Sequence, residues 1–214
     1  MSAVYDPKAI WWLNKWHDRQ RVVVNPNFAG HCSAMSNDPF PLLETSRLRL
    51  RCVELKDAAE TSSLMTSEVS CWLASWPFPF TKTMAEERIR QMCAAALQAD
   101  ALPYAIVLKE GQKLAGWATL TREAFDLRRG TLGYWLGQPY QGRGYTREAI
   151  PAVLSAGFEQ LDLDVIEAGA QPENVRSFAA MRACGMTEAR ARMVYAPARG
   201  REELCLFHEI SRSR

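Results

Sequence analysis

Hydrophobic and polar positions along the chain follow two different periods, and together they predict a mixed α+β fold. In the segment 47–51, leucines alternate with arginines, which is the period of a half-buried strand. The segments 84–98 and 145–161 instead have the length and composition that favour helices. Short β-prone runs predict further strands at 103–109, 113–120, 131–136, 164–170, 192–195 and 203–210.

One more helix is predicted between Asn174 and Gly185, because asparagine is a favoured N-cap and glycine commonly ends a helix. The stretch 72–83 contains Pro77 and Pro79 and is expected to be irregular, since proline interrupts both regular structures. The elements then follow the order strand, helices, three strands, helix, strand, helix, two strands. That order predicts an α+β domain with a mixed, largely antiparallel sheet flanked by helices.

The first part of the chain differs from the remainder, so we divide it into an N-terminal extension, 1–34, and a domain, 35–214. The extension carries Trp11, Trp12 and Trp16 close together. Exposed indoles are unfavourable, so either these side chains dock on another surface or the segment is a poorly ordered tail. The sequence leaves both alternatives open.

Composition and charge exclude several classes of function. The formal net charge of +2 is too small for a dedicated nucleic-acid-binding protein, which normally has a strongly basic face. No apolar run approaches the roughly 20 residues of a membrane span and no signal peptide is visible, so we expect no membrane partner and a cytoplasmic location. The six cysteines form no C-x-x-C pair and there are three histidines, so no metal site is expected. The sequence does not fix the oligomeric state.

The segment that bears most directly on function is a glycine-containing loop between a predicted strand and a predicted helix. The run 132–136 leads into Gly142 and Gly144, and the helix begins near Tyr145. Free backbone N–H groups and the helix dipole at such a junction bind phosphate, and glycine lets the backbone approach the anion closely. Arg143 adds a positive charge between the glycines. A tight turn with no ligand is the alternative.

The spacing Gln141-x-x-Gly144-x-Thr146 resembles the Q/R-x-x-G-x-G/A signature of the GNAT superfamily of N-acetyltransferases. In that superfamily, backbone amides of this loop bind the pyrophosphate of acetyl-CoA. The resemblance implies acetyl-CoA as a co-substrate, with no metal, and contacts to it at Gln141, Gly142, Arg143, Gly144, Tyr145 and Thr146. Thr146 replaces the usual Gly or Ala, which is a mild departure because the backbone makes the contacts.

A second segment, Asn174-x-x-Ser177…Gly185-Met186, is similar to the Asn-x-x-Ser…Gly-Phe segment of RimJ/RimL-type acetyltransferases, which act on ribosomal-protein N-termini. Further matches at 43–51, 133–136 and 144–149 extend the resemblance over about 42–210, in the family's order.

The resemblance implies a GNAT-like sheet whose central strands are splayed apart, with the pantetheine arm of the cofactor between them. It places the cofactor beside Tyr134, Trp135, Leu136 and Asn174. It also implies catalytic roles for Asn174 and Ser177.

The acid and base of the reaction are less evident from the sequence. Many GNAT enzymes use a tyrosine one turn beyond Ser177 as general acid, but this chain has Met181 there. Several relatives have a glutamate where this chain has Thr131. Ser177, or water held by Asn174, is the alternative acid. Glu123 is a remote candidate base, or else simply an exposed surface residue.

A weak base favours an acceptor amine of low pKa. The pKa of a peptide α-amine is about 7.7–8.0 and that of lysine about 10.4, so the α-amine is far easier to neutralise. The hypothesis is therefore an acetyl-CoA-dependent N-acetyltransferase whose acceptor is a protein N-terminal α-amine. Two alternatives are acetylation of a small amine, such as a polyamine or an aminoglycoside, and a non-catalytic acyl-CoA-binding module.

Overall fold

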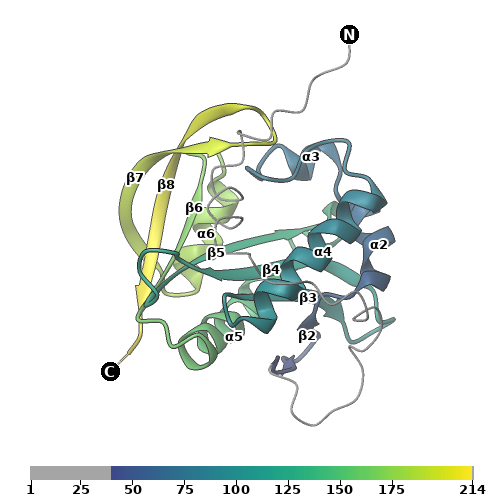
Figure 1. Cartoon of the computed structure of the whole chain (residues 1–214), viewed down its shortest axis with the longest axis horizontal. Helices are drawn as coiled ribbons and strands as arrows, with labels where there is room; N and C mark the ends of the chain where they lie inside the picture. The colour runs from purple at the N-terminus through teal and green to yellow at the C-terminus, as the bar shows by residue number, and fades with distance from the viewer. Residues whose placement is uncertain (1–39, 214) are drawn as a thin grey trace, which may run out of the picture.

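One mixed sheet organises the chain in the computed structural model, which describes residues 40–213 (Figure 1). The sheet has eight strands in the order β1-β2-β3-β4-β5-β6-β8-β7, and all neighbouring pairs are antiparallel except β5 and β6. This arrangement confirms the predicted mixed, largely antiparallel sheet. The strands are β1 (Leu43–Glu44), β2 (Leu48–Cys52), β3 (Ala101–Leu108), β4 (Leu114–Arg122), β5 (Arg129–Leu136), β6 (Val165–Ala170), β7 (Thr187–Ala196) and β8 (Arg201–Ser211).

Helices cover both faces of the sheet. Those of the first half of the domain are η2 (Leu55–Asp57), α2 (Ala58–Leu64), α3 (Ser67–Ser70) and α4 (Lys82–Leu97), and Figure 1 shows α4 lying across the sheet. Those of the second half are η3 (Gln138–Tyr140), α5 (Tyr145–Gln160) and α6 (Val175–Ala183). The segment between α3 and α4, which contains both prolines, has no regular structure, as its sequence predicts.

The two faces of the sheet carry separate hydrophobic clusters, and alternate residues of a strand belong to different clusters. In β3, Tyr104 and Ile106 pack with α5 and α6, whereas Ala105 and Val107 pack with α2, α3 and α4. The same period places Tyr134 on the α5 and α6 side of β5 and Trp135 on the α4 side. Functional side chains from one strand therefore reach both faces.

The strands β5 and β6 diverge after a short parallel pairing. They pair only from Arg129 opposite Val165 to Thr131 opposite Glu167. Beyond this point β5 remains paired with β4 as far as Leu136, and β6 remains paired with β8 as far as Ala170. One edge of β5 is thus open over 132–136, which is the splayed geometry that the resemblance implied.

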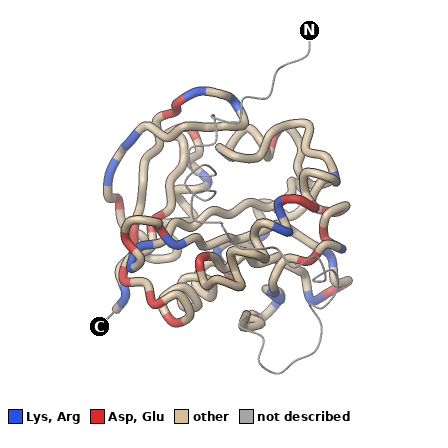
Figure 2. Tube along the Cα trace, in the orientation of Figure 1, with Lys and Arg blue, Asp and Glu red and all other residues tan. Residues whose placement is uncertain are grey.

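The C-terminal hairpin of β7 and β8 carries several arginines, and most of them are paired. Figure 2 shows Lys and Arg positions close to Asp and Glu positions along this hairpin. Arg190 and Arg192 each lie 2.5 Å from the buried Glu167 carboxylate, and Arg199 lies 2.7 Å from Glu203. The pairs of Arg190 and Arg192 with Glu167 join the hairpin to β6, whereas the Arg199 pair lies within the hairpin.

The N-terminal extension, 1–34, lies outside the described residues, so its boundary and the role of its tryptophans stay predictions. None of the helices found within 40–213 combines the length and apolarity that crossing a bilayer requires.

Candidate active site

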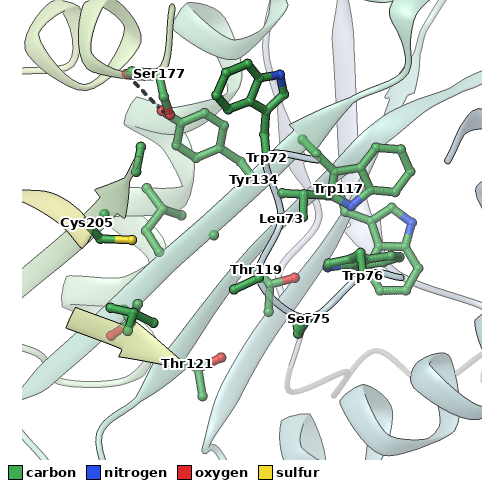
Figure 3. Close-up of a pocket in the computed structure, with 18 of the residues that line it drawn as sticks. Trp72, Leu73, Ser75, Trp76, Trp117, Thr119, Thr121, Tyr134, Ser177 and Cys205 are labelled. Carbon is green, nitrogen blue, oxygen red and sulfur yellow. Dashed lines mark hydrogen bonds between the residues drawn. The ribbon is translucent and has the colours of Figure 1, made fainter. Parts of the chain in front are cut away.

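A large cleft opens where β5 and β6 diverge. Its volume is about 2210 Å³, well above the range of roughly 300–1,000 Å³ of most small-molecule pockets. It is lined by β4 and β5, by the starts of α5 and α6, by α4 with the segment before it, and by β7 and β8. Figure 3 shows Tyr134 and Ser177 on one side of it, Trp76 and Trp117 on another, and Thr119 and Thr121 below them in the view. This space is large enough for a long cofactor and an acceptor together.

The loop before α5 has the conformation of an anion-binding site. Gly142 and Gly144 have φ angles of +72° and +79°, in the left-handed region that glycine adopts without strain. The first helical hydrogen bond of α5 runs from the Glu148 N–H to the Gly144 carbonyl. Within the described residues, the N–H groups of 142–147 donate to no protein acceptor. A row of free donors at a helix N-terminus can bind a phosphate or pyrophosphate group.

The side chain of Gln141 belongs to the scaffold of this loop. Its amide Nε2 donates to the Leu136 carbonyl oxygen over 2.9 Å, which ties the loop to the end of β5. The family motif implied that Gln141 contacts the cofactor. Its side chain lines the cleft and also holds the loop in position.

Two arginines near the loop were missed by the sequence analysis. Arg147, in the first turn of α5, and Arg176, in the first turn of α6, line the cleft and form no ion pair within the described residues. The Arg143 side chain is exposed and is not part of the lining, although its carbonyl oxygen accepts a hydrogen bond from Arg47 Nη1 over 3.0 Å. Arg147 and Arg176 could have been predicted from the sequence, because each is a basic residue in the first turn of a predicted helix.

The start of α6 holds two hydroxyl groups in contact. Tyr134 Oη lies 2.9 Å from Ser177 Oγ and donates to the Ser177 carbonyl oxygen over 3.1 Å (Figure 3). Asn174 caps the helix, with its Oδ1 accepting from the Ser177 N–H over 3.2 Å. Burial raises the pKa of Tyr134 to about 12, although the hydrogen bond with Ser177 opposes the shift. Both hydroxyls are therefore protonated at neutral pH.

Met181 does not line the cleft. It is 2% exposed and packs in the cluster between α6 and the sheet. The hydroxyl beside Ser177 comes instead from Tyr134 on β5. The sequence analysis named Tyr134 only as a cofactor contact and did not foresee this hydrogen bond.

The carboxylates near the cleft differ in whether they are free to act as bases. Glu203 accepts hydrogen bonds from Arg199, Arg201 and Gln171, and the bond from Arg199 contributes most to holding its pKa at about 2. Glu167 is buried, but its bonds with arginines outweigh the effect of burial and lower its pKa. Glu123 lines the cleft, half-buried, and its side chain makes no hydrogen bond within the described residues.

Comparison with known proteins decides the family. A family model described as an acetyltransferase (GNAT) domain matches residues 47–187. The chain belongs to the GNAT acetyltransferase family. It is an acetyltransferase, as its sequence motifs predicted.

Individual relatives agree with this assignment. The chain is 29% identical over 160 residues to an uncharacterised N-acetyltransferase, p20, from Bacillus licheniformis. The aligned region covers 74% of this chain and 89% of that protein. A Vibrio cholerae structure assigned as a ribosomal-protein-serine acetyltransferase is 26% identical, with a TM-score of 0.69 over 81% of this chain and 99% of that one. RimJ of Mycobacterium smegmatis, solved with a CoA disulfide, superposes with a TM-score of 0.68 at 24% identity over 77% and 81% of the two chains. Membership of the GNAT family supports acetyl-CoA as the co-substrate.

Proposed function

We propose that this GNAT acetyltransferase transfers the acetyl group of acetyl-CoA to a protein N-terminal α-amine. The observation that carries the proposal is the meeting of three features at one place: free N–H donors at 142–147, the open edge of β5 at 132–136, and the hydroxyl pair of Tyr134 and Ser177. The ribosomal-protein acetyltransferases among the structural neighbours support the same class of acceptor.

Each part of the cleft has a task in this proposal. The N–H groups of Gly142, Gly144 and Thr146 would bind the pyrophosphate, and Arg147 and Arg176 would add charge-assisted contacts. The open edge of β5, at Tyr134, Trp135 and Leu136, offers backbone groups that can bind and orient the pantetheine arm. An N–H on this edge can also polarise the thioester carbonyl in the manner of an oxyanion hole.

Ser177 is the proposed proton donor to the thiolate that leaves when the acetyl group is transferred. Its Oγ is in hydrogen-bond contact with Tyr134 Oη, so as the Ser177 proton passes to the thiolate, the phenol proton can turn from the Ser177 carbonyl to Ser177 Oγ, and the phenolate then takes a proton from solvent. The Tyr134 pKa of about 12 keeps the phenol protonated between turnovers. Asn174 orders the turn that presents Ser177.

The pairing of Glu203 with arginines favours an amine that loses its proton easily. Glu203 has a pKa of about 2 and is bound by arginines, which makes it a poor proton acceptor. An α-amine, with a pKa of about 7.7–8.0, is partly neutral in solution and needs little help. Lysine, with a pKa of about 10.4, would need a stronger base than Glu203, whose pKa is about 2.

The charge of the cleft argues against polycationic acceptors. Its described lining contains more arginines than carboxylates: Arg88, Arg90, Arg122, Arg147, Arg176 and Arg192 against Glu87, Asp100, Glu123 and Glu203. A polyamine or an aminoglycoside would enter against this positive charge.

The test is a measurement of free CoA release by the full chain with acetyl-CoA and a panel of N-terminal peptides, polyamines and aminoglycosides. We expect turnover with peptides, and mass spectrometry should locate the acetyl group on the α-amine. Acetylation confined to lysine side chains, polyamines or aminoglycosides would overturn the proposal. Tight acetyl-CoA binding without turnover of any amine would instead favour the non-catalytic module.

A further inference from the structure

An aromatic cluster forms the wall of the cleft on the α4 side. Its centre is Trp76, whose ring centroid lies 5.3 Å from that of Trp117, 5.3 Å from that of Trp135 and 4.9 Å from that of Phe80. Trp76, Trp117 and Trp135 all line the cleft. Figure 3 shows Trp76 and Trp117 beside each other, with Ser75 nearby.

Arg88, from α4, brings a positive charge into this wall. Its guanidinium carbon lies 4.4 Å from the centroid of the Trp76 ring, and its Nη2 donates to the Ser75 carbonyl oxygen over 2.5 Å. These contacts fix the guanidinium against the aromatic ring and leave further N–H donors unused.

This cation has no carboxylate partner within the described residues. Arginines elsewhere in the fold, such as Arg51, Arg129 and Arg199, each pair with an Asp or a Glu. Arg88 forms no such pair, and burial alone lowers its pKa, to about 10. It is therefore still charged at neutral pH, in a partly desolvated position where a counter-ion would be stabilising.

A second unused donor lies in the same wall. The Nε1 of Trp135 is buried and has no hydrogen-bond partner within residues 40–213. The neighbouring Trp117 differs, because its Nε1 donates to Thr61 Oγ1 over 3.0 Å. Because the Trp135 Nε1 atom is itself buried, it helps to define the wall, and Arg88 is the donor that a ligand in the cleft can reach.

We propose that Arg88, held against the Trp76 ring in the cleft wall, forms a subsite for a carboxylate of the acceptor, so that the preferred acceptor is an amine whose molecule also carries a carboxylate. The unused N–H donors of Arg88 belong to a cation, so the group that satisfies them is an anionic acceptor of hydrogen bonds. The inference rests on the proposed function only in taking the cleft to be the place where an amine binds. The carboxylate can come from an acidic residue near a protein N-terminus or from the α-carboxyl group of a free amino acid.

The experiment changes the substrate first, because that leaves the protein intact. Peptide amides with Glu or Gln at the first, second or third residue are compared for kcat/KM, and free amino acids are compared with their amides. We expect a preference of about tenfold or more for the carboxylate in one of the two series, as for a charge-assisted hydrogen bond. The series that shows it identifies the source of the carboxylate. No preference in either series overturns the proposal.

The protein is then changed at the subsite. In Arg88→Gln the preference should fall to within about threefold, through a higher KM for the acidic substrate and an unchanged KM for the neutral one. Lys82→Gln removes one charge from the same helix outside the cleft and should leave the preference intact. A preference that survives in folded Arg88→Gln overturns the assignment of the residue.

Binding of the acetylated Glu and Gln peptides, followed by calorimetry, separates this inference from the proposed function. If no amine is turned over but the wild-type chain binds the acetylated Glu peptide more tightly, and Arg88→Gln does not, the subsite stands and the proposed activity falls. If N-terminal peptides are turned over equally well with Glu or Gln, the proposed activity stands and the subsite falls.

Discussion

Arg47 and Glu148 form an ion pair with Nε and Oε2 2.7 Å apart, although 101 positions separate them in the chain. Arg47 lies just before β2 and Glu148 in the first turn of α5. Arg47 also donates to the Arg143 carbonyl oxygen, and its guanidinium lies 4.7 Å from the centroid of the Tyr145 ring. Two of the sequence segments that suggested the family, 43–51 and 144–149, therefore meet in space, and Arg47 ties β2 to the loop before α5.

Replacement of Glu148 should destabilise the fold in a pH-dependent way. Burial raises the pKa of Glu148, but hydrogen bonds from Thr45, Arg47 and Ser46 outweigh it and hold the pKa at about 2. Because the folded-state pKa is lower than the unfolded one, the stabilisation is complete above about pH 4.5 and is lost as the pH falls towards 2. Glu148→Gln should lower the free energy of unfolding by about 1–3 kcal/mol at pH 7, and by progressively less below pH 4.5.

Urea unfolding at several pH values measures this difference. Glu159→Gln, at the exposed far end of the same helix, is the matched control and should change little. Curves for the wild type and Glu148→Gln that differ by the same amount at pH 7 and pH 2.5 would contradict the assigned pKa.

Gly144 should be needed for acetyl-CoA binding more than for folding. Its φ of +79° is strained for any residue with a Cβ, so Gly144→Ala should cost about 1–2 kcal/mol of stability. The same change should also turn the free N–H groups away from their common target and weaken acetyl-CoA binding by about tenfold or more. Gly200→Ala is the control, since Gly200 has a φ of +65° in the β7–β8 turn with open space around it. Calorimetry should show similar stability losses and a loss of affinity only in Gly144→Ala; equal affinities in the two variants would reject the phosphate site.

Ser177 and Tyr134 should act as one unit in turnover. Ser177→Ala removes the proposed proton donor, and kcat should fall by about 10²-fold, which is typical of general acid catalysis. Tyr134→Phe keeps the ring and removes only the hydroxyl, so a smaller loss is expected. The double variant should be little worse than Ser177→Ala, because the two hydroxyls serve the same proton.

Steady-state kinetics with a peptide acceptor, over a range of pH, test this coupling. Ser155→Ala removes an exposed hydroxyl from α5 and is the control. Losses that add independently in the double variant would show that Tyr134 supports Ser177 only structurally or not at all.

The sequence predicted the regular elements well where a strand or helix has a clear apolar face. It underestimated β7, predicted at 192–195 but extending over Thr187–Ala196, because most of this edge strand is exposed and the apolar residues of its first half are small alanines. The short helix α3 was also missed. Its four residues, Ser67–Ser70, are too few for a helical period to be recognised.

The candidate site likewise has one part that was predictable from the sequence and another that was not. The glycine loop was predictable because the left-handed conformations of Gly142 and Gly144 depend on local sequence. The contact of Tyr134 with Ser177 and the stacking of Arg88 on Trp76 were not, because each joins elements whose relative position is set by the whole sheet. From the sequence alone, Arg88 is indistinguishable from an ordinary surface residue of a polar helix, because its contact with the Trp76 ring joins two separate segments.

Asn174 should matter for turnover beyond its role as a helix cap. Its Oδ1 accepts from the Ser177 N–H, while its Nδ2 donates to no partner within the described residues and lines the cleft. Asn174→Ala should lose the cap, about 1 kcal/mol of stability, together with the free amide. Asn174→Asp keeps a capping oxygen, loses the N–H donor and adds a negative charge, which is favourable at a helix N-terminus, so its stability should be at least that of the wild type. If the amide binds pantetheine or water beside Ser177, kcat/KM should fall by about tenfold or more in both variants. Thermal unfolding and steady-state kinetics on the same samples separate the two roles: full activity in Asn174→Asp would leave Asn174 as a cap alone.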